Sequence, residues 1–330
     1  MEMSVVISVM NEAENVLPLL SQLKSALKNF DHEIIFVDDG STDNTVWKLT
    51  SIPDPRVKVV ELSKNFGQTA ALAAGISQSK GDYIVTMDGD LQNDPSDIPI
   101  LYNAIQNLHT DMVVGRRVHR QDDFWLRKVP SKIANILIRK VSKVDVHDYG
   151  CALKIMTRQL ARSLPLSGEL HRFITILAAQ AGAKIAEIDV NHHARIHGKT
   201  KYGLDRASKV LSDLLFLLFQ QHFGSKPIHF FGKIGLASFG IGSLASLYLL
   251  YLKMIGQAIG GRPLLLMSIT LIIAGLQLIS LGIIMEFILR ISYQTGSSST
   301  YTIRNVFVGG EALLKRPAKR NKYASREPYK

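Results

Sequence analysis

Two long runs without a charged residue constrain this chain more than any other feature of its sequence. Residues 234–252 and 263–285 contain no Asp, Glu, Lys or Arg. A helix rises about 1.5 Å per residue, so each run can cross the roughly 30 Å hydrocarbon core of a bilayer. Only residues 253–262 separate the two runs. The sequence therefore predicts a transmembrane hairpin within residues 230–290, with helices at about 232–253 and 263–289.

The distribution of basic residues predicts the side of the membrane on which the rest of the chain lies. The loop between the runs carries Lys253 and Arg262. The tail that follows, residues 291–330, carries Arg304, Lys315, Arg316, Lys319, Arg320, Lys322, Arg326 and Lys330. The positive-inside rule then places the tail and the large N-terminal part in the cytoplasm. The net charge of +11 is compatible with nucleic acid, but the apolar runs favour an anionic membrane surface or phosphorylated substrates instead.

Residues 1–203 are expected to form one cytoplasmic α/β domain. Apolar runs rich in β-branched residues predict buried parallel strands at 4–10, 33–37, 57–62 and 83–87. Helical stretches between them, one ending near residue 30 and others at 45–50 and 68–78, complete a βαβ alternation. Further strands are expected at 111–115 and 185–192, and a helix at 169–181.

Four polar turns follow the predicted strands, and in open α/β sheets ligands bind beyond the carboxyl ends of the strands. The residues that share this position are Asn11, Glu12, Asp38, Asp39, Asn65, Asp88 and Asp90. Two carboxylates two residues apart can share a hard divalent cation if the backbone bends between them, and Gly89 permits such a bend. Acidic turns that cap a helix or face solvent have the same pattern. The motif by itself leaves both interpretations open.

Three later segments combine basic and apolar residues. Residues 124–144, which follow the pair Arg116-Arg117, suit either a helix packed on the protein core or an interfacial helix at the membrane surface. The loop at 195–203, Arg-Ile-His-Gly-Lys-Thr-Lys-Tyr-Gly, suits closure on phosphate oxygens, although a solvated linker has the same composition. Residues 204–229 are expected to form a second, juxtamembrane amphipathic helix.

Five motifs occur in the order found in one known family. They are Val-Ile-Ser-Val-Met-Asn-Glu at 6–12, Val-Asp-Asp-Gly-Ser-Thr-Asp at 37–43, Asn-Phe-Gly-Gln-Thr-Ala-Ala-Leu-Ala-Ala-Gly at 65–75, Met-Asp-Gly-Asp-Leu-Gln at 87–92 and Gly-Lys-Thr-Lys-Tyr at 198–202. As an ordered set over residues 4–290, the chain resembles the polyisoprenyl-phosphate glycosyltransferases. The resemblance implies a glycosyltransferase-A fold, which is Rossmann-like, and inverting transfer of a sugar from a nucleotide diphosphate to a lipid phosphate.

The resemblance assigns the donor side of the site to the four polar turns. Asp88, Asp90 and Gln92 match metal-binding positions for Mg2+ or Mn2+, cations that prefer oxygen ligands. Binding of the nucleotide sugar is implied for Asn11, Glu12, Asp38, Asp39, Asn65, Asp88 and Gly89. Either Asp38 or Asp39 would contact the base, and the motif does not distinguish them.

The acceptor side is assigned, by the same resemblance, to basic residues and a third acid. Positions that bind the acceptor phosphate are matched by Arg117, Arg127, Ser131 and Arg195, and the cationic loop adds Lys199 and Lys201. Asp148 matches the acid usually described as the catalytic base. A phosphate monoester with a second pKa of about 6 is already largely dianionic at neutral pH. Orienting the acceptor arginines or the attacking oxygen is therefore an alternative role for Asp148.

Residues 148–153, Asp-Tyr-Gly-Cys-Ala-Leu, depart from the Asp-Pro-x-Ser-Gly-Phe pattern of dolichol-phosphate mannose synthases. They look like the bacterial undecaprenyl-phosphate branch that serves O-antigen glucosylation. The expected activity is transfer of glucose from UDP-glucose to undecaprenyl phosphate at the bacterial inner membrane. GDP-mannose or a UDP-amino-arabinose derivative as donor stays open, as does a non-catalytic membrane scaffold. Small residues between positions 235 and 246 also permit a homo-oligomer.

Overall fold

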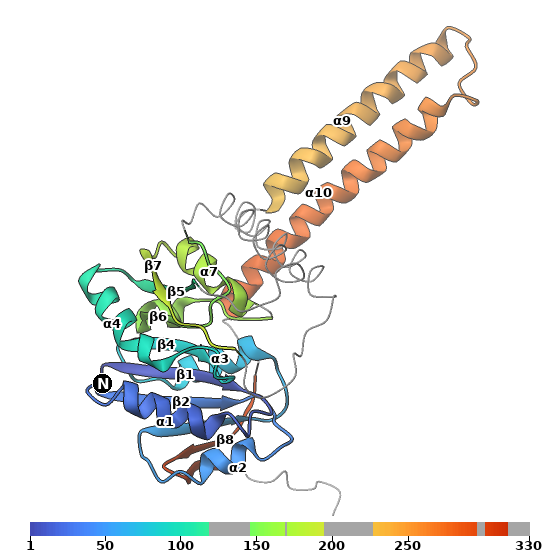
Figure 1. Cartoon of the computed structure of the whole chain (residues 1–330). Coiled ribbons are helices and arrows are strands. Elements are labelled where there is room, and N and C mark those ends of the chain that lie inside the picture. Colours follow the sequence, from blue (N-terminus) through green and yellow to red (C-terminus); the bar gives the residue numbers. More distant parts are fainter. Residues whose placement is uncertain (119–145, 169, 195–226, 296–300, 316–330) are drawn as a thin grey trace, which may run out of the picture. The chain divides into compact units, whose positions relative to one another are not determined.

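The computed structural model describes residues 1–118, 146–168, 170–194, 227–295 and 301–315 (Figure 1). The chain divides into two compact units. One unit comprises Met1–Lys209 with Ser299–Lys330, and the other comprises Val210–Ser298. The amphipathic segment predicted at 124–144, most of the one predicted at 204–229 and the end of the basic tail lie outside the described residues.

The larger unit is built on one mixed sheet. Its described part has nine strands in the order β7-β5-β6-β4-β1-β2-β3-β8-β9 (Figure 1). The strands are β1 (Met3–Val9), β2 (His32–Asp38), β3 (Val57–Leu62), β4 (Tyr83–Asp88), β5 (Met112–Arg117), β6 (Lys154–Thr157), β7 (Ile185–Val190), β8 (Ile303–Val308) and β9 (Glu311–Lys315). The strands β1 to β4 pair in parallel, as the sequence predicts, whereas β6 runs antiparallel between β4 and β5.

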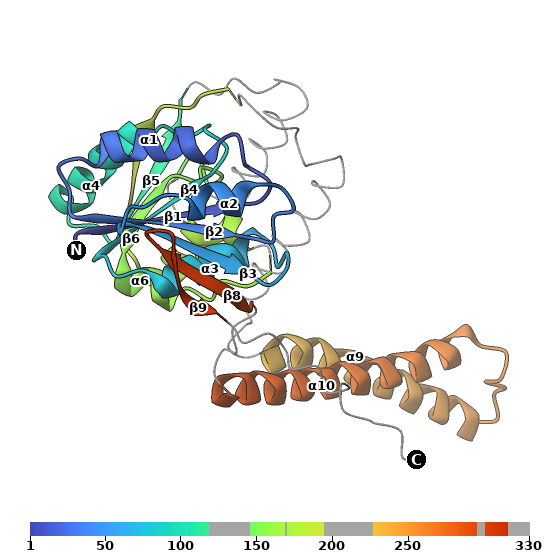
Figure 2. The ribbon, with the colours of Figure 1, turned by 90° about the horizontal axis from the view of Figure 1, so that it is seen from below.

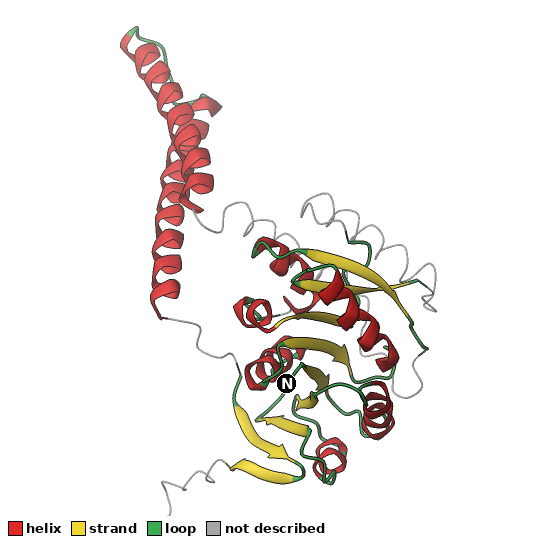
Figure 3. Cartoon of the chain, turned by 90° about the vertical axis from the view of Figure 1, so that its left-hand side faces the viewer, coloured by secondary structure: helices red, strands yellow, loops and turns green. Residues whose placement is uncertain are grey.

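Helices cover both faces of this sheet (Figures 2 and 3). On one face lie α1 (Val16–Ala26), α2 (Thr45–Thr50), the 3-10 turn η1 (Pro95–Asp97) and α4 (Ile98–Asn107). On the other lie α3 (Gln68–Gln78), α6 (Arg158–Ser163), the 3-10 turn η3 (Leu170–Phe173) and α7 (Ile174–Gln180). In α1, Leu19, Leu20 and Leu23 recur at helical spacing and are buried in a core shared with Ile7 and Phe36.

Helix α3 lies unusually close to the sheet because its inner face is made of small residues. Ala70, Ala71 and Ala74 are buried there. A Cβ placed on Gly75 would lie 2.3 Å from Val6 Cγ1 and 2.9 Å from Val37 Cγ2. Only glycine fits at such a distance. The close packing fixes the first turn of α3 beside the carboxyl ends of the strands.

The C-terminal stretch of the chain differs most from the sequence-based expectation. The sequence predicts a basic tail at residues 291–330. In the structure, residues 303–315 of this stretch form β8 and β9, which extend the sheet beyond β3. The turn between them is Gly309-Gly310, with φ of 57° and 86°. Two glycines at positive φ between short apolar runs are typical of a two-residue hairpin. That local signal could have predicted the hairpin.

Side-chain contacts attach β8 firmly to its neighbours. Arg304 forms an ion pair with Glu61, 2.9 Å from Nη1 to Oε1, and its Nη2 donates to the Ser63 carbonyl at 2.7 Å. Asn305 Nδ2 donates to the second oxygen of Glu61 at 2.7 Å. Val306 is buried. The hairpin is therefore part of the folded domain.

Deleting residues 301–330 is expected to destabilise the larger unit, because β3 loses one of its two partner strands and buried Val306 is removed. Burying a valine side chain is worth about 1.5–3 kcal/mol, and about 1 kcal/mol shifts the Tm of a domain this size by roughly 2–4 °C. A drop in Tm of about 5 °C or more is expected in thermal unfolding of the detergent-solubilised chain. Deleting only residues 316–330 is the matched control, since it removes basic residues and keeps both strands. Equal Tm values for the two deletions would contradict this role of the hairpin.

The smaller unit is a helical hairpin of α9 (Pro227–Met254) and α10 (Pro263–Thr295). Both helices are long and apolar enough to cross a membrane. Glycines allow their backbones to approach: a Cβ on Gly235 would lie 2.8 Å from the Gly275 carbonyl oxygen, and one on Gly242 would lie 2.8 Å from the Ser268 carbonyl oxygen. Ser238 Oγ donates to the Leu271 carbonyl at 2.8 Å. Packing within the hairpin thus accounts for these small residues without a second copy of the chain.

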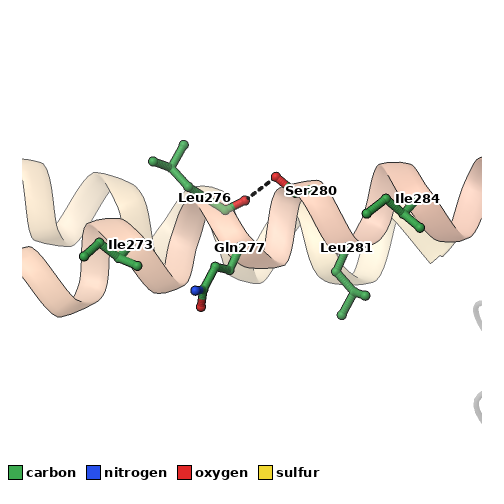
Figure 4. Close-up of a pocket in the computed structure, with 6 residues that line it drawn as sticks. All are labelled: Ile273, Leu276, Gln277, Ser280, Leu281 and Ile284. Carbon is green, nitrogen blue, oxygen red and sulfur yellow. Dashed lines mark hydrogen bonds between the residues drawn. The ribbon is translucent and has the colours of Figure 1, made fainter.

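One face of α10 has a shallow apolar hollow (Figure 4). It is lined by Ile273, Leu276, Gln277, Ser280, Leu281 and Ile284. The Ser280 hydroxyl donates to the Leu276 carbonyl at 2.9 Å, so it needs no outside partner. The hollow therefore presents a mostly hydrocarbon surface, which suits lipid surroundings.

Candidate active site

The polar turns after the first four strands leave the sheet at one edge. The strand register places Ser8 beside Asp88, Val9 beside Asp38, and Asp38 beside Glu61. Because the carboxyl ends of parallel strands meet there, the turns lie together, as the sequence predicts. The candidate residues at this edge are Asn11, Glu12, Asp38, Asp39, Asn65, Asp88, Gly89, Asp90 and Gln92.

Asn11 and Glu12 connect the turn after β1 with the turn after β2. The backbone of Asn11 is left-handed, with φ of 54°, a conformation that asparagine adopts more readily than most residues. Its N–H donates to Ser41 Oγ at 2.8 Å, and its Oδ1 accepts from the Thr42 N–H at 2.8 Å. The N–H of Glu12 donates to Thr45 Oγ1 at 2.9 Å. These bonds make the two turns one rigid wall of the site.

Asp38 and Asp39 are both buried but have different partners. Asp39 accepts from the N–H of Phe66 at 2.7 Å and from that of Gly67 at 2.9 Å, so it fastens the loop before α3. Asp38 Oδ2 accepts from the N–H groups of residues 40 and 41, at 3.1 and 3.0 Å. Its Oδ1 is buried and has no hydrogen-bond partner among the described residues. Burial raises the pKa of both carboxyls.

Asn65 shapes the same loop that Asp39 fastens. Its Oδ1 accepts from the Gly67 N–H at 2.9 Å, and its Nδ2 lies 3.0 Å from Met10 Sδ. Gly67 precedes α3 with φ of 94°, a value that favours glycine. The side chain of Asn65 therefore braces the backbone between β3 and α3.

The backbone of the turn at 88–92 bends from residue 89 to residue 91. Leu91, with φ of 62°, is the residue in the left-handed region. Gly89 is also required for space, since a Cβ there would lie 2.6 Å from Val9 Cγ1. Asp90 Oδ1 accepts from the Gln92 N–H at 3.2 Å, which closes the turn. Gly89 thus lies in the bend between the two acids, as the sequence predicts, and Leu91 turns the chain further.

Gln68, the first residue of α3, is a site residue that the sequence analysis missed. Its Nε2 donates to Asp88 Oδ1 at 2.7 Å. The other oxygen of Asp88 makes no hydrogen bond within the described chain. Burial, and then the charge of Asp90, raise the pKa of Asp88 to about 6, while Lys154 and Arg117 act in the opposite sense. Two acids crowded in this way favour a bound cation.

The donor set of this turn fits a hard divalent cation in part. Asp88, Asp90 and Gln92 offer carboxylate and amide oxygens, which Mg2+ and Mn2+ prefer. Within the described ranges, no group of three or more His, Cys, Asp or Glu residues is arranged to hold a metal. Mg2+ is commonly held by one or two carboxylates together with substrate phosphates. The turn therefore suits a cation that arrives with a diphosphate.

Arg117, at the end of β5, and Asp148 form a two-point ion pair. Arg117 Nε lies 2.7 Å from Asp148 Oδ2, and Nη2 lies 2.8 Å from Oδ1. The Gly150 N–H donates to Oδ1 at 3.2 Å, and Glu187 Oε1 accepts from the Asp148 N–H at 2.9 Å. Both carboxylate oxygens are thus engaged. This geometry suits a carboxylate that orients a guanidinium.

The remaining acceptor-side candidates lie outside the described residues. They are Arg127, Ser131, Arg195, Lys199 and Lys201. Their assignment stays a prediction.

The turn that carries Gln92 is also bonded to the segment that leads into the cationic loop. The His193 N–H donates to the Gln92 carbonyl at 2.9 Å, and His193 Nε2 lies 3.0 Å from Asp94 Oδ2. Asn93 and His192 form an antiparallel bridge. These contacts hold the donor-side turn against the chain just before residue 195. They join residues about a hundred positions apart, which no local pattern predicts.

Comparison with known proteins agrees with the family resemblance seen in the sequence and gives a glycosyltransferase. The sequence model of "Glycosyl transferase family 2" matches residues 4–164. The chain is 42% identical to "Dodecaprenyl-phosphate galacturonate synthase" of Rhizobium johnstonii, over 93% of each chain. It is 35% identical to "Undecaprenyl-phosphate 4-deoxy-4-formamido-L-arabinose transferase" of Shewanella sediminis, over 93% of this chain and 92% of that one. In structure it is similar to glucosyl-3-phosphoglycerate synthase from Mycobacterium tuberculosis, with a TM-score of 0.52, 18% identity and coverage of 67% and 79%.

The mixed sheet with helices on both faces is a glycosyltransferase-A fold, and the chain is a glycosyltransferase. It belongs to glycosyl transferase family 2, and within that family to the polyprenyl-phosphate glycosyltransferases. The expected fold class, enzyme class and family resemblance are confirmed.

Proposed function

We propose that this enzyme transfers one sugar from a nucleoside diphosphate to a polyprenyl phosphate at the cytoplasmic face of the membrane. The observation that carries the proposal is the 42% identity, over 93% of each chain, to a protein named for making a dodecaprenyl-phosphate sugar. The apolar hairpin of α9 and α10 supports it, since a lipid phosphate has to be met at a membrane. The excess of basic residues after the hairpin supports the cytoplasmic orientation.

In the proposed reaction an oxygen of the lipid phosphate forms a bond to the anomeric carbon of the sugar. The bond from that carbon to the nucleoside diphosphate breaks, and its electron pair leaves with the diphosphate. Attack from the opposite side inverts the anomeric centre. A bound Mg2+ or Mn2+, held by Asp88, Asp90 and Gln92, would stabilise the charge that develops on the leaving diphosphate.

The protein residues have distinct tasks in this proposal. The buried, unpartnered Oδ1 of Asp38 is the better candidate to accept a hydrogen bond from the base, because both oxygens of Asp39 already hold the loop at 66–67. Gln68 fixes one oxygen of Asp88 and leaves the other for the cation. Arg117, oriented by Asp148, receives the lipid phosphate. Because that phosphate is largely dianionic at neutral pH, Asp148 acts as an orienting group and no general base is required.

The donor sugar is proposed from the relatives. Glucose was the first expectation, but the relatives reported above are named for galacturonate and for 4-deoxy-4-formamido-L-arabinose. Galacturonate, carried on UDP, is therefore proposed as the first donor to test, ahead of UDP-linked formamido-arabinose and UDP-glucose.

The purified full-length chain, incubated with undecaprenyl or dodecaprenyl phosphate, Mn2+ and each of these donors in turn, tests the proposal. A lipid product heavier than the acceptor by one sugar residue is expected by mass spectrometry, and the donor with the largest kcat/KM identifies the substrate. If no donor, GDP-mannose included, yields a lipid-linked sugar, the alternative of a non-catalytic scaffold gains support.

Metal binding is expected to depend on pH through Asp88. The pKa of this group is about 6 in the folded chain, against about 3.9 in an unfolded one, so the folded state binds its proton more tightly. The resulting stabilisation is present below about pH 4 and is lost as the pH rises through about 6. A divalent cation can replace the proton above that pH. Mn2+ should therefore raise the Tm more at about pH 7.5 than at about pH 5.

Scanning fluorimetry of the full chain with and without Mn2+ measures this difference. Asp88→Asn is the matched variant, because an amide cannot ionise and its Tm shift should lose the pH dependence. A Mn2+ shift of the same size at both pH values in the wild type would contradict the assignment of Asp88.

A further inference from the structure

The buried residue Lys154 has no role in the proposed reaction, yet it lies between the two halves of the site. It is the first residue of β6, where it pairs with Thr86 of β4 and with Val114 of β5 (Figure 1). The residue as a whole is 3% exposed. A buried lysine is rare unless something specific requires it, because burying an ammonium group is costly.

The first thing that Lys154 does is hold the backbone of the turn that follows Asp148. Its Nζ donates to the Cys151 carbonyl oxygen. The neighbouring carbonyl, that of Ala152, accepts from Thr86 Oγ1 at 3.0 Å. Two successive carbonyls of the turn are thus bonded to side chains that face each other across the β4–β6 pair. The turn at 148–152 is thereby fixed to β4, two residues before Asp88.

The second observation is electrostatic. Lys154 is close enough to interact electrostatically with two carboxylates. They are Asp88 on the donor side and Asp148 on the acceptor side. Burial lowers the pKa of Lys154, and the nearby side chains of Cys151, Asp148 and Asp88 act in the opposite sense. Arg117 interacts with the same cluster. The Lys154 side chain therefore lies close to both acids that the two substrates would meet.

From these contacts, and resting on the proposed function, we propose that Lys154 is a positioning residue that sets the distance between the two substrates. By bonding the Cys151 carbonyl, it holds the turn at 148–152 against β6, whose partner strand β4 ends in Asp88, and so keeps the Asp148–Arg117 pair in register with Asp88. Thr86 assists through its bond to the same turn. Lys154 itself touches neither substrate in this account. Its loss should misplace the acceptor phosphate relative to the sugar while leaving the metal turn in place.

Three variants separate this role from a purely structural one. Lys154→Met keeps the length of the side chain and removes its charge and its hydrogen bond. Lys154→Arg keeps a long cationic donor. Thr86→Val removes only the second bond to the turn. For each variant, steady-state kinetics with the acceptor varied, Mn2+ binding by electron paramagnetic resonance and the Tm are measured on the full-length chain.

The expected result is a selective loss on the acceptor side. A displacement of about 1 Å can slow a reaction by about 100-fold, so Lys154→Met should lower kcat/KM for the polyprenyl phosphate by roughly 10- to 100-fold. Its affinity for Mn2+ should stay within about threefold of the wild type, because the metal turn keeps its own contacts, including that of Gln68. Lys154→Arg should recover most of the activity, and Thr86→Val should show a smaller loss of the same kind.

Several results would overturn the inference. One is a kcat/KM for the polyprenyl phosphate in Lys154→Met that equals that of the wild type. Another is a loss of Mn2+ binding in Lys154→Met that parallels its loss of turnover. If Lys154→Met does not fold, Lys154→Arg and Thr86→Val decide, and unchanged acceptor kinetics in Thr86→Val would then contradict the role of the turn. The wild type serves in the same assay as the reference. Absence of product from the wild type refutes the proposed function, whereas wild-type product with an unaffected Lys154→Met refutes this inference alone.

Discussion

Replacing Asp90 with alanine is expected to abolish sugar transfer while the fold stays intact. Asp90 lies in the turn after β4, and its charge is the main one acting on half-buried Asp88. Without it the turn loses one of two carboxylates for a divalent cation. A loss of about 4 kcal/mol of leaving-group stabilisation slows transfer about a thousandfold. The rate of product formation with saturating nucleotide sugar and Mn2+, compared with that of the wild type, measures this decrease directly.

Asp82→Ala is the matched control for that experiment. Asp82 precedes the same strand at its opposite end, is exposed, and pairs with Arg158 at 3.0 Å. Its removal changes the net charge by the same amount and leaves the turn at 88–92 untouched. Activity should stay close to that of the wild type. Metal-dependent transfer retained in Asp90→Ala, with a normal Tm, would show that this turn is not the metal site.

The second large effect is expected from Asp148→Asn. Asp148 holds Arg117 at two points, and an amide cannot pair with a guanidinium in this way. Removing one partner of a buried ion pair costs roughly 3–5 kcal/mol, so the Tm is expected to fall as well. A guanidinium that is no longer oriented should lower kcat/KM for the lipid phosphate by on the order of 100-fold. Acceptor titrations at a fixed donor concentration check this.

A double-mutant cycle distinguishes the orienting role from that of a base. If Asp148 acts through Arg117, then Asp148→Asn, Arg117→Ala and the double variant should lose similar amounts of activity, since the two residues form one unit. If Asp148 acted as a general base, Asp148→Asn would instead lose much more activity than Arg117→Ala. Additive losses in the double variant would contradict the orienting role.

The parallel half of the fold could be predicted from the sequence because its signals are local. Continuous β-branched runs such as Met3–Val9 mark buried strands, and a polar turn after each strand places its residues at one edge. This position identifies Asn11, Glu12, Asp38, Asp39, Asn65, Asp88 and Asp90, whereas Gly89 and Gln92 come from the family resemblance. Their grouping depends only on the direction of the strands, which the βαβ alternation already sets.

The missed features depend on contacts between distant parts of the chain. Strand β6 is only four residues long and takes its place between β4 and β5 through antiparallel pairing. The bond from Gln68 to Asp88 spans 20 positions, and that from Thr86 to Ala152 spans 66. No periodicity in the sequence encodes such pairs. Gly89 illustrates the same limit, since its need for space next to Val9 comes from the neighbouring strand.

We propose that the residues at the carboxyl ends of β1 to β4 carry out metal-dependent transfer of a sugar to a lipid phosphate. The most direct measurement is mass spectrometry of the lipid extracted after the purified chain has met undecaprenyl phosphate and UDP-galacturonate, with Mn2+ or with excess EDTA. A polyprenyl phosphate heavier by one sugar residue is expected in the presence of Mn2+, and unmodified lipid is expected in EDTA. A lipid that stays unmodified with every donor, or a product that forms equally well in EDTA, would contradict the proposal.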